Sequence, residues 1–166
     1  NTGYATWTFN YKPAPDSAER TVPVHVWYPT EDEHNYRGDP PTQSPVYAGL
    51  FADRDTIVDA VPAAPVYESG FPILAFSHGN QGLAGGSYRL MRYFSSHGWL
   101  GLAVGHVGNR ISDGAEATNR PVTHWHHRPL DISAALDALE TLDSSHPLSS
   151  ADTTSVLLTG HSRGAY

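Results

Sequence analysis

The N-terminal residues alternate between apolar and polar positions. The alternation runs through "YATWTFNY" (residues 4–11) and returns in "RTVPVHVWYPT" (residues 20–30), with a Pro-Asp-Ser turn between the two runs. A period of two residues predicts half-buried strands, so this segment is expected to form a β-hairpin. Pro23 lies inside the second run and has no N–H for a strand ladder, which favours an edge position for that strand.

Three short apolar runs follow further along the chain. They are "FPILAFSHG", "WLGLAVGHVG" and "TSVLLTG", which span residues 71–79, 99–108 and 154–160. Continuous apolar runs of this length that end in turn residues are typical of strands covered on both faces.

Two helical patterns separate these runs. The first begins after Ser87, a candidate N-cap, and ends before Gly98. Its apolar residues Tyr88, Met91 and Phe94 recur at helical spacing. The second has Pro129 near its first turn, which is where a helix tolerates proline. One face of this second helix carries the apolar residues Ile132, Ala135, Leu136, Leu139 and Leu142.

The order strand, helix, strand, helix, strand predicts a mostly parallel sheet with right-handed crossovers, preceded by the antiparallel hairpin. We therefore expect the α/β fold class. Residues 31–70 show no sustained period and are expected to form a long loop, with a short helix over residues 53–60. At 166 residues, the chain is long enough for one domain and short for two.

Composition narrows the range of partners. The formal net charge is -7, with a single lysine, Lys12, against nine arginines, so nucleic acid is not an expected partner. No apolar run approaches the roughly 18 to 20 residues that a membrane span requires. The absence of cysteine excludes disulfides and thiolate chemistry. The chain begins at Asn1 without a signal-like segment, which fits a mature secreted or periplasmic protein and fits a trimmed chain equally well.

The last run ends in Gly160-His161-Ser162-Arg163-Gly164, which has the form G-x-S-x-G. Directly after a buried strand, this pattern predicts a nucleophile elbow, a tight turn that raises the serine hydroxyl into a cleft. The alternative is a structural Gly-Ser-Gly turn. We expect Ser162 to be a catalytic nucleophile.

A second motif, "SHGNQG" at residues 77–82, follows the first apolar run and should lie at the same edge of the sheet. A loop of this kind can turn a backbone N–H toward the serine. The amides of Asn80 and Arg163 are therefore candidates for an oxyanion hole. His78 is expected to hold the loop by hydrogen bonds rather than to act as a base.

Several polar and aromatic residues precede or follow these elements. The cluster His124, Trp125, His126 and His127 is expected in the loop before the second helix, and no metal site is expected there. We take Trp125 and His126, together with His106 and Asn109, as candidates for lining a pocket. For Arg128, a contact with Asp131 at the helix start is favoured over a contact with a neighbouring loop.

Taken in order, "VPVHVWYPT", "PILAFSHGNQG", "SSHGWLGLAVGHVGNR", "RPLDISAALDAL" and "VLLTGHSRGAY" resemble the α/β-hydrolases of the dienelactone-hydrolase-like and platelet-activating-factor-acetylhydrolase-like branch. The resemblance covers most of the chain from about Arg20 onward, and it extends to polyester hydrolases and chlorophyllase-like enzymes. Arg163 and Ala165 stand where many relatives have other residues.

The resemblance implies a carboxylester hydrolase with a Ser-His-Asp triad and no metal or organic cofactor. In this superfamily the acid and the histidine follow the serine. All ten histidines here precede Ser162. We therefore expect residues 1–166 to be the N-terminal portion of one hydrolase domain, whose remainder is a second chain or a further segment of the same hydrolase.

The expected substrate is a small-molecule or polymer ester. Two alternatives remain open at this stage. One is a non-catalytic ligand-binding protein on a hydrolase scaffold, and the other is a serine peptidase or amidase, which shares the elbow.

Overall fold

The computed structural model describes residues 2–30, 60–62, 70–114 and 121–166. Six strands lie in the described residues: β1 (Thr2–Tyr11), β2 (Arg20–Pro29), β3 (Ala60–Pro62), β4 (Phe71–Ser77), β5 (Leu100–Val104) and β6 (Ala151–Gly160). The two α-helices of these segments are α1 (Tyr88–Ser95) and α3 (Pro121–Glu140). Short 3₁₀ helices are η1 (Ala84–Ser87), η2 (Ile111–Asp113), η3 (Pro147–Ser150) and η4 (Ser162–Ala165). The helix expected over residues 53–60 falls outside the described residues, apart from Ala60, which lies in β3.

The strands form one mixed sheet in the order β3-β1-β2-β5-β4-β6. β1 and β2 pair antiparallel over their whole lengths, which confirms the predicted hairpin. β4 pairs parallel with both β5 and β6. β2 pairs antiparallel with β5 and thereby joins the hairpin to the parallel part of the sheet. The predicted α/β class is confirmed.

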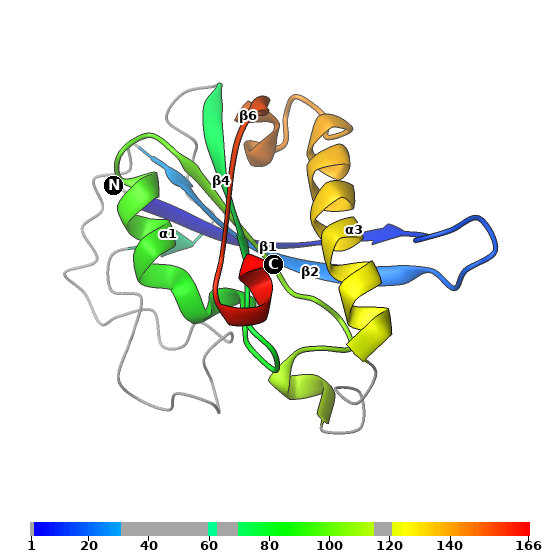
Figure 1. Cartoon of the computed structure of the whole chain (residues 1–166). Helices are drawn as coiled ribbons and strands as arrows, with labels where there is room; N and C mark the ends of the chain where they lie inside the picture. The colour runs from blue at the N-terminus through cyan, green and yellow to red at the C-terminus, as the bar shows by residue number, and fades with distance from the viewer. Residues whose placement is uncertain (1, 31–59, 63–69, 115–120) are drawn as a thin grey trace.

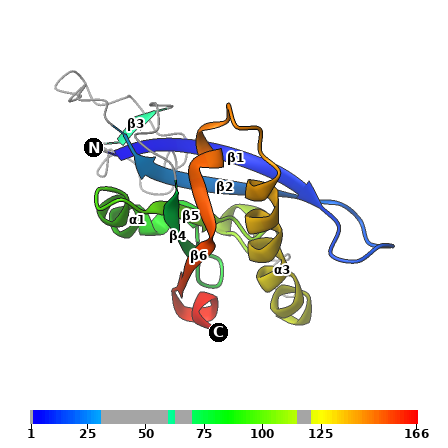
Figure 2. The same cartoon turned by 90° about the horizontal axis from the view of Figure 1, so that it is seen from above.

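Helices cover both faces of the sheet, with α1 on one side and α3 on the other (Figures 1 and 2). In β4, Ile73 and Ala75 belong to the core under α3, whereas Leu74 and Phe76 belong to the core under α1. Alternate residues of a strand point to opposite faces, so a strand covered on both faces must be apolar throughout. This explains the continuous apolar runs of β4 and β5.

The edge position predicted for the strand that contains Pro23 is wrong. β2 lies inside the sheet, between β1 and β5. Its pairing with β5 begins one residue after the proline, at Val24 opposite Val104. The Pro23 carbonyl still accepts a hydrogen bond from the Gly105 amide at 2.8 Å. Pro23 therefore lies at the end of the β2–β5 ladder, toward which its carbonyl points, while it is paired with Thr8 inside the β1–β2 ladder. The missing N–H is on the β5 side, where it removes no internal hydrogen bond.

The predicted start of the second helix also needs correction. α3 begins at Pro121, and Pro129 lies inside it rather than in its first turn. Residues 124–127 are consequently helical and not part of a loop. A proline removes one helix hydrogen bond, which makes it a signal for a helix boundary in sequence. Here the buried Ala135 and Leu139 pack α3 onto the sheet and outweigh that local preference.

The first helix agrees with its prediction. Met91 is fully buried in the core under α1, and Gly98 adopts a φ of 87° just past the helix end. That positive φ is the left-handed conformation that glycine supplies after helices. Ser87 occupies the N-cap position, but its side chain makes no capping hydrogen bond.

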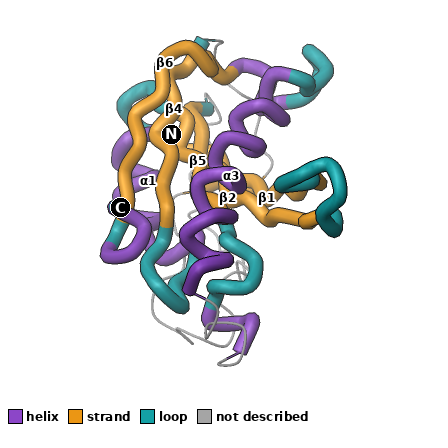
Figure 3. The backbone as a smooth tube through the Cα atoms, turned by 45° about the vertical axis from the view of Figure 1, so that its right-hand side comes forward, coloured by secondary structure: helices purple, strands orange, loops and turns teal. Residues whose placement is uncertain are grey.

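β6 lies at the edge of the described sheet and pairs only with β4 (Figure 3). The prediction that the run at residues 154–160 is covered on both faces is not met by the described residues, because Leu157 is 47% exposed and Leu158 is 63% exposed. An apolar edge strand is an unusual surface, because it exposes both unpaired backbone N–H and C=O groups and apolar side chains to solvent. The candidate elbow lies directly at the end of this strand.

Candidate active site

Ser162 occupies the tight turn that its motif predicts. Its φ is 53°, a left-handed conformation that non-glycine residues rarely adopt. The turn joins β6 to η4 and is closed by a hydrogen bond from the Gly164 amide to the His161 carbonyl at 2.9 Å. Strain of this kind is retained only where surrounding structure enforces it, and it is concentrated at functional sites.

Close backbone contacts leave no room for a side chain at either glycine of the motif. A Cβ at Gly160 would overlap the Gly164 carbonyl, and a Cβ at Gly164 would overlap the carbonyls of Ser77 and His78. The His161 amide donates to the Ser77 carbonyl at 3.1 Å, which draws the turn against the end of β4. The two glycines therefore allow the elbow to pack directly on the His-Gly loop.

The loop that follows β4 lies beside the serine. A Cβ at Gly79 would be 3.3 Å from the Ser162 Cβ. His78 holds this loop, since its Nδ1 donates to the Gly79 carbonyl at 2.7 Å and its Nε2 accepts from the His106 amide at 3.1 Å. Burial, together with the nearby His106, lowers the pKa of His78 to about 3 and keeps its ring neutral. The geometry matches the structural role expected for His78.

The two candidates for the oxyanion hole meet through their side chains. Nη1 of Arg163 donates to Oδ1 of Asn80 at 2.7 Å. Nδ2 of Asn109 donates to the same oxygen at 2.9 Å. The loop after β4, the elbow and the loop after β5 are thus linked at one atom.

A buried network that the sequence did not indicate lies beneath the loop. Ser77 Oγ and His106 Nε2 are 2.9 Å apart, and His106 Nδ1 lies 3.1 Å from Asp131 Oδ2. A carboxylate only accepts hydrogen bonds, so His106 donates a hydrogen bond from Nδ1 to Asp131. Its Nε2 therefore accepts a hydrogen bond from the Ser77 hydroxyl. Burial lowers the pKa of His106, so this ring is neutral as well.

Asp131 is the charged centre of this network. It accepts hydrogen bonds from Tyr11 Oη at 2.6 Å and from Arg20 Nε at 3.0 Å, in addition to His106. Burial disfavours the charged carboxylate, but these hydrogen bonds more than offset it and hold the pKa of Asp131 below its usual value. Asp131 thereby joins the hairpin, α3 and the loop after β5.

The order Ser77, His106, Asp131 has the connectivity of a catalytic triad, yet its serine is not placed for catalysis. Ser77 is 4% exposed. Its hydroxyl donates to His106 and accepts from Arg128 Nη2 at 2.9 Å. Ser77 is among the residues that line the pocket between α3 and the end of β6, but its hydroxyl is already engaged both as a donor and as an acceptor, whereas a nucleophile must be open to its substrate.

The contact with Asp131 that was predicted from the sequence for Arg128 is wrong. Its guanidinium does not pair with Asp131, which binds Arg20 instead. Arg128 donates from Nη1 to Asn109 Oδ1 at 2.6 Å and from Nη2 to both Ser77 Oγ and the His78 carbonyl. Because α3 begins earlier than predicted, Arg128 lies well inside the helix and reaches the neighbouring loops rather than the helix start.

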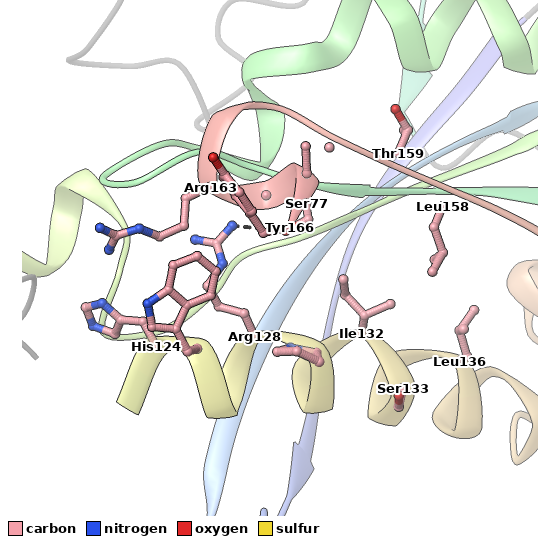
Figure 4. A pocket seen from close by; sticks show the side chains of 15 residues that line it. Ser77, His124, Arg128, Ile132, Ser133, Leu136, Leu158, Thr159, Arg163 and Tyr166 are labelled. Atoms are coloured by element: carbon pink, nitrogen blue, oxygen red, sulfur yellow. Dashed lines mark hydrogen bonds between the residues drawn. The ribbon is translucent and has the colours of Figure 1, made fainter. Parts of the chain in front are cut away.

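A pocket of about 550 Å³ opens between α3 and the end of β6. Figure 4 shows Ile132 and Leu136 of α3 directed toward Leu158 of β6 across it. Trp125 and Arg163 also line the pocket, and the Arg163 guanidinium lies 5.7 Å from the centre of the Trp125 ring. This pocket is mostly apolar, with Arg128 and Arg163 as its cations.

The remaining predicted pocket residues lie elsewhere. His106 and Asn109 are fully buried in the network and are not among the residues that line the pocket. His126 is on the exposed side of α3 and does not line it either. Ser162 is next to the lining residues Arg163 and Gly164 without being one of them.

No histidine is hydrogen-bonded to the Ser162 hydroxyl within the described ranges, and no cluster of metal-binding side chains occurs in that part of the chain. The histidines 124, 126 and 127 share a helix without converging on a common point. None of the helices described is long and apolar enough to cross a membrane.

The sequence reasoning missed Ser77, Asp131, Arg20 and Tyr11 as partners in one network. Only an indirect feature of the sequence pointed to this network. Buried charges require partners, so the charged residues Arg128 and Asp131 three positions apart in an amphipathic helix could have pointed to a polar core. Their partners come from segments up to 120 residues away, which no local pattern reveals.

The sequence matches no protein-family model and no curated protein. Among solved structures, the chain is similar to a ferulic acid esterase from Streptomyces cinnamoneus, with a TM-score of 0.69 and 19% sequence identity. The similarity covers 98% of this chain and 52% of the esterase, so the chain spans about half the length of that protein. The mixed α/β fold of this chain is therefore similar to that of part of an esterase.

Proposed function

We propose that the chain carries the nucleophile of a serine-dependent carboxylester hydrolase with an α/β-hydrolase fold. The observation that supports this most directly is the backbone of Ser162, which has a φ of 53° between two glycines whose positions no larger residue could take. Backbone strain of this kind is concentrated at functional sites, and Gln81 in the neighbouring loop after β4 has the same φ of 53°. The likeness to an esterase agrees with the proposal.

In the proposed reaction, Ser162 Oγ attacks the ester carbonyl carbon while a histidine takes the hydroxyl proton. The backbone amides of Asn80 and Arg163 hold the negative oxygen of the tetrahedral intermediate. The alcohol leaves with the proton from the histidine, and water then releases the acyl group from the serine.

The histidine and the acid of this triad are proposed to come from a segment beyond these 166 residues, as the resemblance to α/β-hydrolases implies. The edge strand supports this proposal. Leu157 and Leu158 are exposed on β6, and among the described strands β6 pairs only with β4, so a further strand could pair with it and cover them. The network around Asp131 already uses its histidine and carboxylate in other contacts.

A fluorophosphonate probe tests the nucleophile, because only an activated serine displaces its fluoride to form an O–P bond. The full-length protein should be labelled once, and peptide mass spectrometry should place the label on Ser162. Labelling of Ser77 would instead assign the nucleophile to the buried network and overturn the proposal.

Two variants complete the test. Ser162→Ala should lower kcat for p-nitrophenyl butyrate at least about a thousandfold, whereas Ser77→Ala should retain turnover. Unchanged turnover in Ser162→Ala would remove this serine from the mechanism. A wild type that neither reacts with the probe nor hydrolyses the ester would favour a non-catalytic binding protein. A preference for anilide over ester substrates would favour a peptidase or amidase.

A further inference from the structure

Arg128 is a buried cation whose described contacts are all neutral. It is 5% exposed, and its guanidinium donates to Ser77 Oγ, Asn109 Oδ1 and the His78 carbonyl. The carboxylate on the same helix, Asp131, is bound to Arg20. Burying a cation is costly unless hydrogen bonds compensate it, so these contacts are the reason that the charge is tolerated.

The contacts of Arg128 fall on both sides of the candidate oxyanion donor. On one side, the bond to the His78 carbonyl fixes the peptide that precedes Gly79. On the other side, Asn109 Oδ1 accepts from Arg128 while Asn109 Nδ2 donates to Asn80 Oδ1. One guanidinium on α3 therefore holds the loop directly at its start and indirectly at Asn80.

The loop held in this way has little freedom to shift without affecting the serine. Gly79 is packed so closely against the elbow that a Cβ there would be 3.1 Å from His161 Nδ1 and 3.3 Å from the Ser162 Cβ. Asn80 is tied to Arg163 in the elbow itself. Because the stabilisation of an oxyanion depends on donors held in fixed positions, small displacements of this loop reduce it.

We propose that Arg128 is a positioning residue, which fixes the His-Gly loop from α3 so that the Asn80 amide faces the oxygen that becomes negative at Ser162. Asn109 relays this positioning from Arg128 to Asn80. The inference rests on the proposed function of Ser162 and extends it to Arg128 and Asn109, which act on the reaction through the loop that they hold.

The test compares variants of the full-length protein with p-nitrophenyl butyrate as substrate. Arg128→Ala and Asn109→Asp should each lower kcat, by about 10- to 100-fold, with KM changed less than about threefold, because the affected interaction forms in the transition state. Asn109→Asp is nearly isosteric and keeps the acceptor for Arg128, so it remains informative if Arg128→Ala does not fold.

Rescue and control variants separate positioning from general loss of structure. Millimolar guanidinium ion should restore part of the kcat of Arg128→Ala, while the same concentration of sodium ion should not. Leu139→Ala leaves a cavity in the core under the same helix, about 16 Å along its axis. It should lower stability while keeping kcat within about twofold.

The outcomes distinguish this inference from the proposed function. If fluorophosphonate labels Ser162 of the wild type but both Arg128→Ala and Asn109→Asp keep wild-type kcat, the positioning role is wrong and the nucleophile stands. A rise in KM with unchanged kcat in Arg128→Ala and Asn109→Asp would also overturn the positioning role. So would a loss of kcat in Leu139→Ala equal to that in Arg128→Ala. If the wild type is not labelled at Ser162, the proposed function fails first.

Discussion

The side chains of Asn80 and Arg163 are joined by a hydrogen bond of 2.7 Å, although the two residues are 83 positions apart. One belongs to the loop after β4 and the other to the turn after β6. These are the residues whose backbone amides we propose as the donors of an oxyanion hole. An oxyanion hole depends on the relative position of its donors, so a direct link between them bears on the chemistry and not only on stability.

The packing of the elbow leads to a prediction for Gly164. A methyl group there would overlap the Ser77 and His78 carbonyls, which belong to backbone and cannot move aside easily. Gly164→Ala should therefore lower the free energy of unfolding by about 3 kcal/mol or more. Urea denaturation followed by circular dichroism measures this change. Gly86→Ala is the matched control, since nothing lies within 4 Å of a Cβ there, and a similar loss in that variant would contradict the argument.

Burial of His78 predicts that the protein loses stability in acid. Above pH 6.5 this histidine is neutral in both the folded and the unfolded state and contributes no pH dependence. Between pH 6.5 and about 3, its pKa in the folded protein, the unfolded chain takes up a proton that the folded protein does not. Stability therefore falls as pH falls through this window.

The contribution of His78 can be isolated with His78→Gln, which keeps an acceptor near the His106 amide. The variant should be less stable at pH 7.5 but lose less stability on going to lower pH. The slope should differ by up to about 1.4 kcal/mol per pH unit. Chemical denaturation at pH 7.5 and pH 5.5 measures both values, and identical slopes in the two proteins would show that His78 does not titrate differently on folding.

The exposed edge of β6 predicts self-association of the 166-residue chain. Sedimentation velocity should show an average mass that rises with protein concentration, because an open apolar strand pairs with other copies. Leu158→Lys should reduce this association. Leu90→Lys changes another exposed leucine, on α1 and away from the edge, and should leave it unchanged. Equal effects of the two substitutions would point to general solubility rather than to the strand edge.

Local patterns in the sequence were sufficient for most elements of the fold. The period of two residues in the hairpin, the apolar runs of β4 and β5 and the elbow motif each report burial along a short segment, and burial is what fixes these elements. The N-terminal start of α3 was missed because Pro129 carries a strong local signal, which tertiary packing of the helix overrides.

The candidate site was only partly predictable, for a different physical reason. The positions of Ser162, Gly79 and Asn80 follow from motifs at the ends of strands. The contacts of Arg128 and Asp131 depend on pairs such as Ser77 with Arg128, which lie 51 residues apart. Nothing in the sequence near Arg128 distinguishes a bond to Asp131 from a bond to another loop, because both satisfy the same buried charge.

The enclosed arrangement of Ser77, His106 and Asp131 has a practical consequence for assigning enzymes from coordinates. A search that looks only for a hydroxyl, an imidazole and a carboxylate in line would select this trio, with separations of 2.9 and 3.1 Å, and would pass over Ser162. Solvent exposure and backbone conformation favour Ser162 instead, because it is exposed and has a positive φ, whereas Ser77 is buried. In proteins with polar interiors, such searches gain specificity when they ask whether the candidate oxygen has a free path to a reactant.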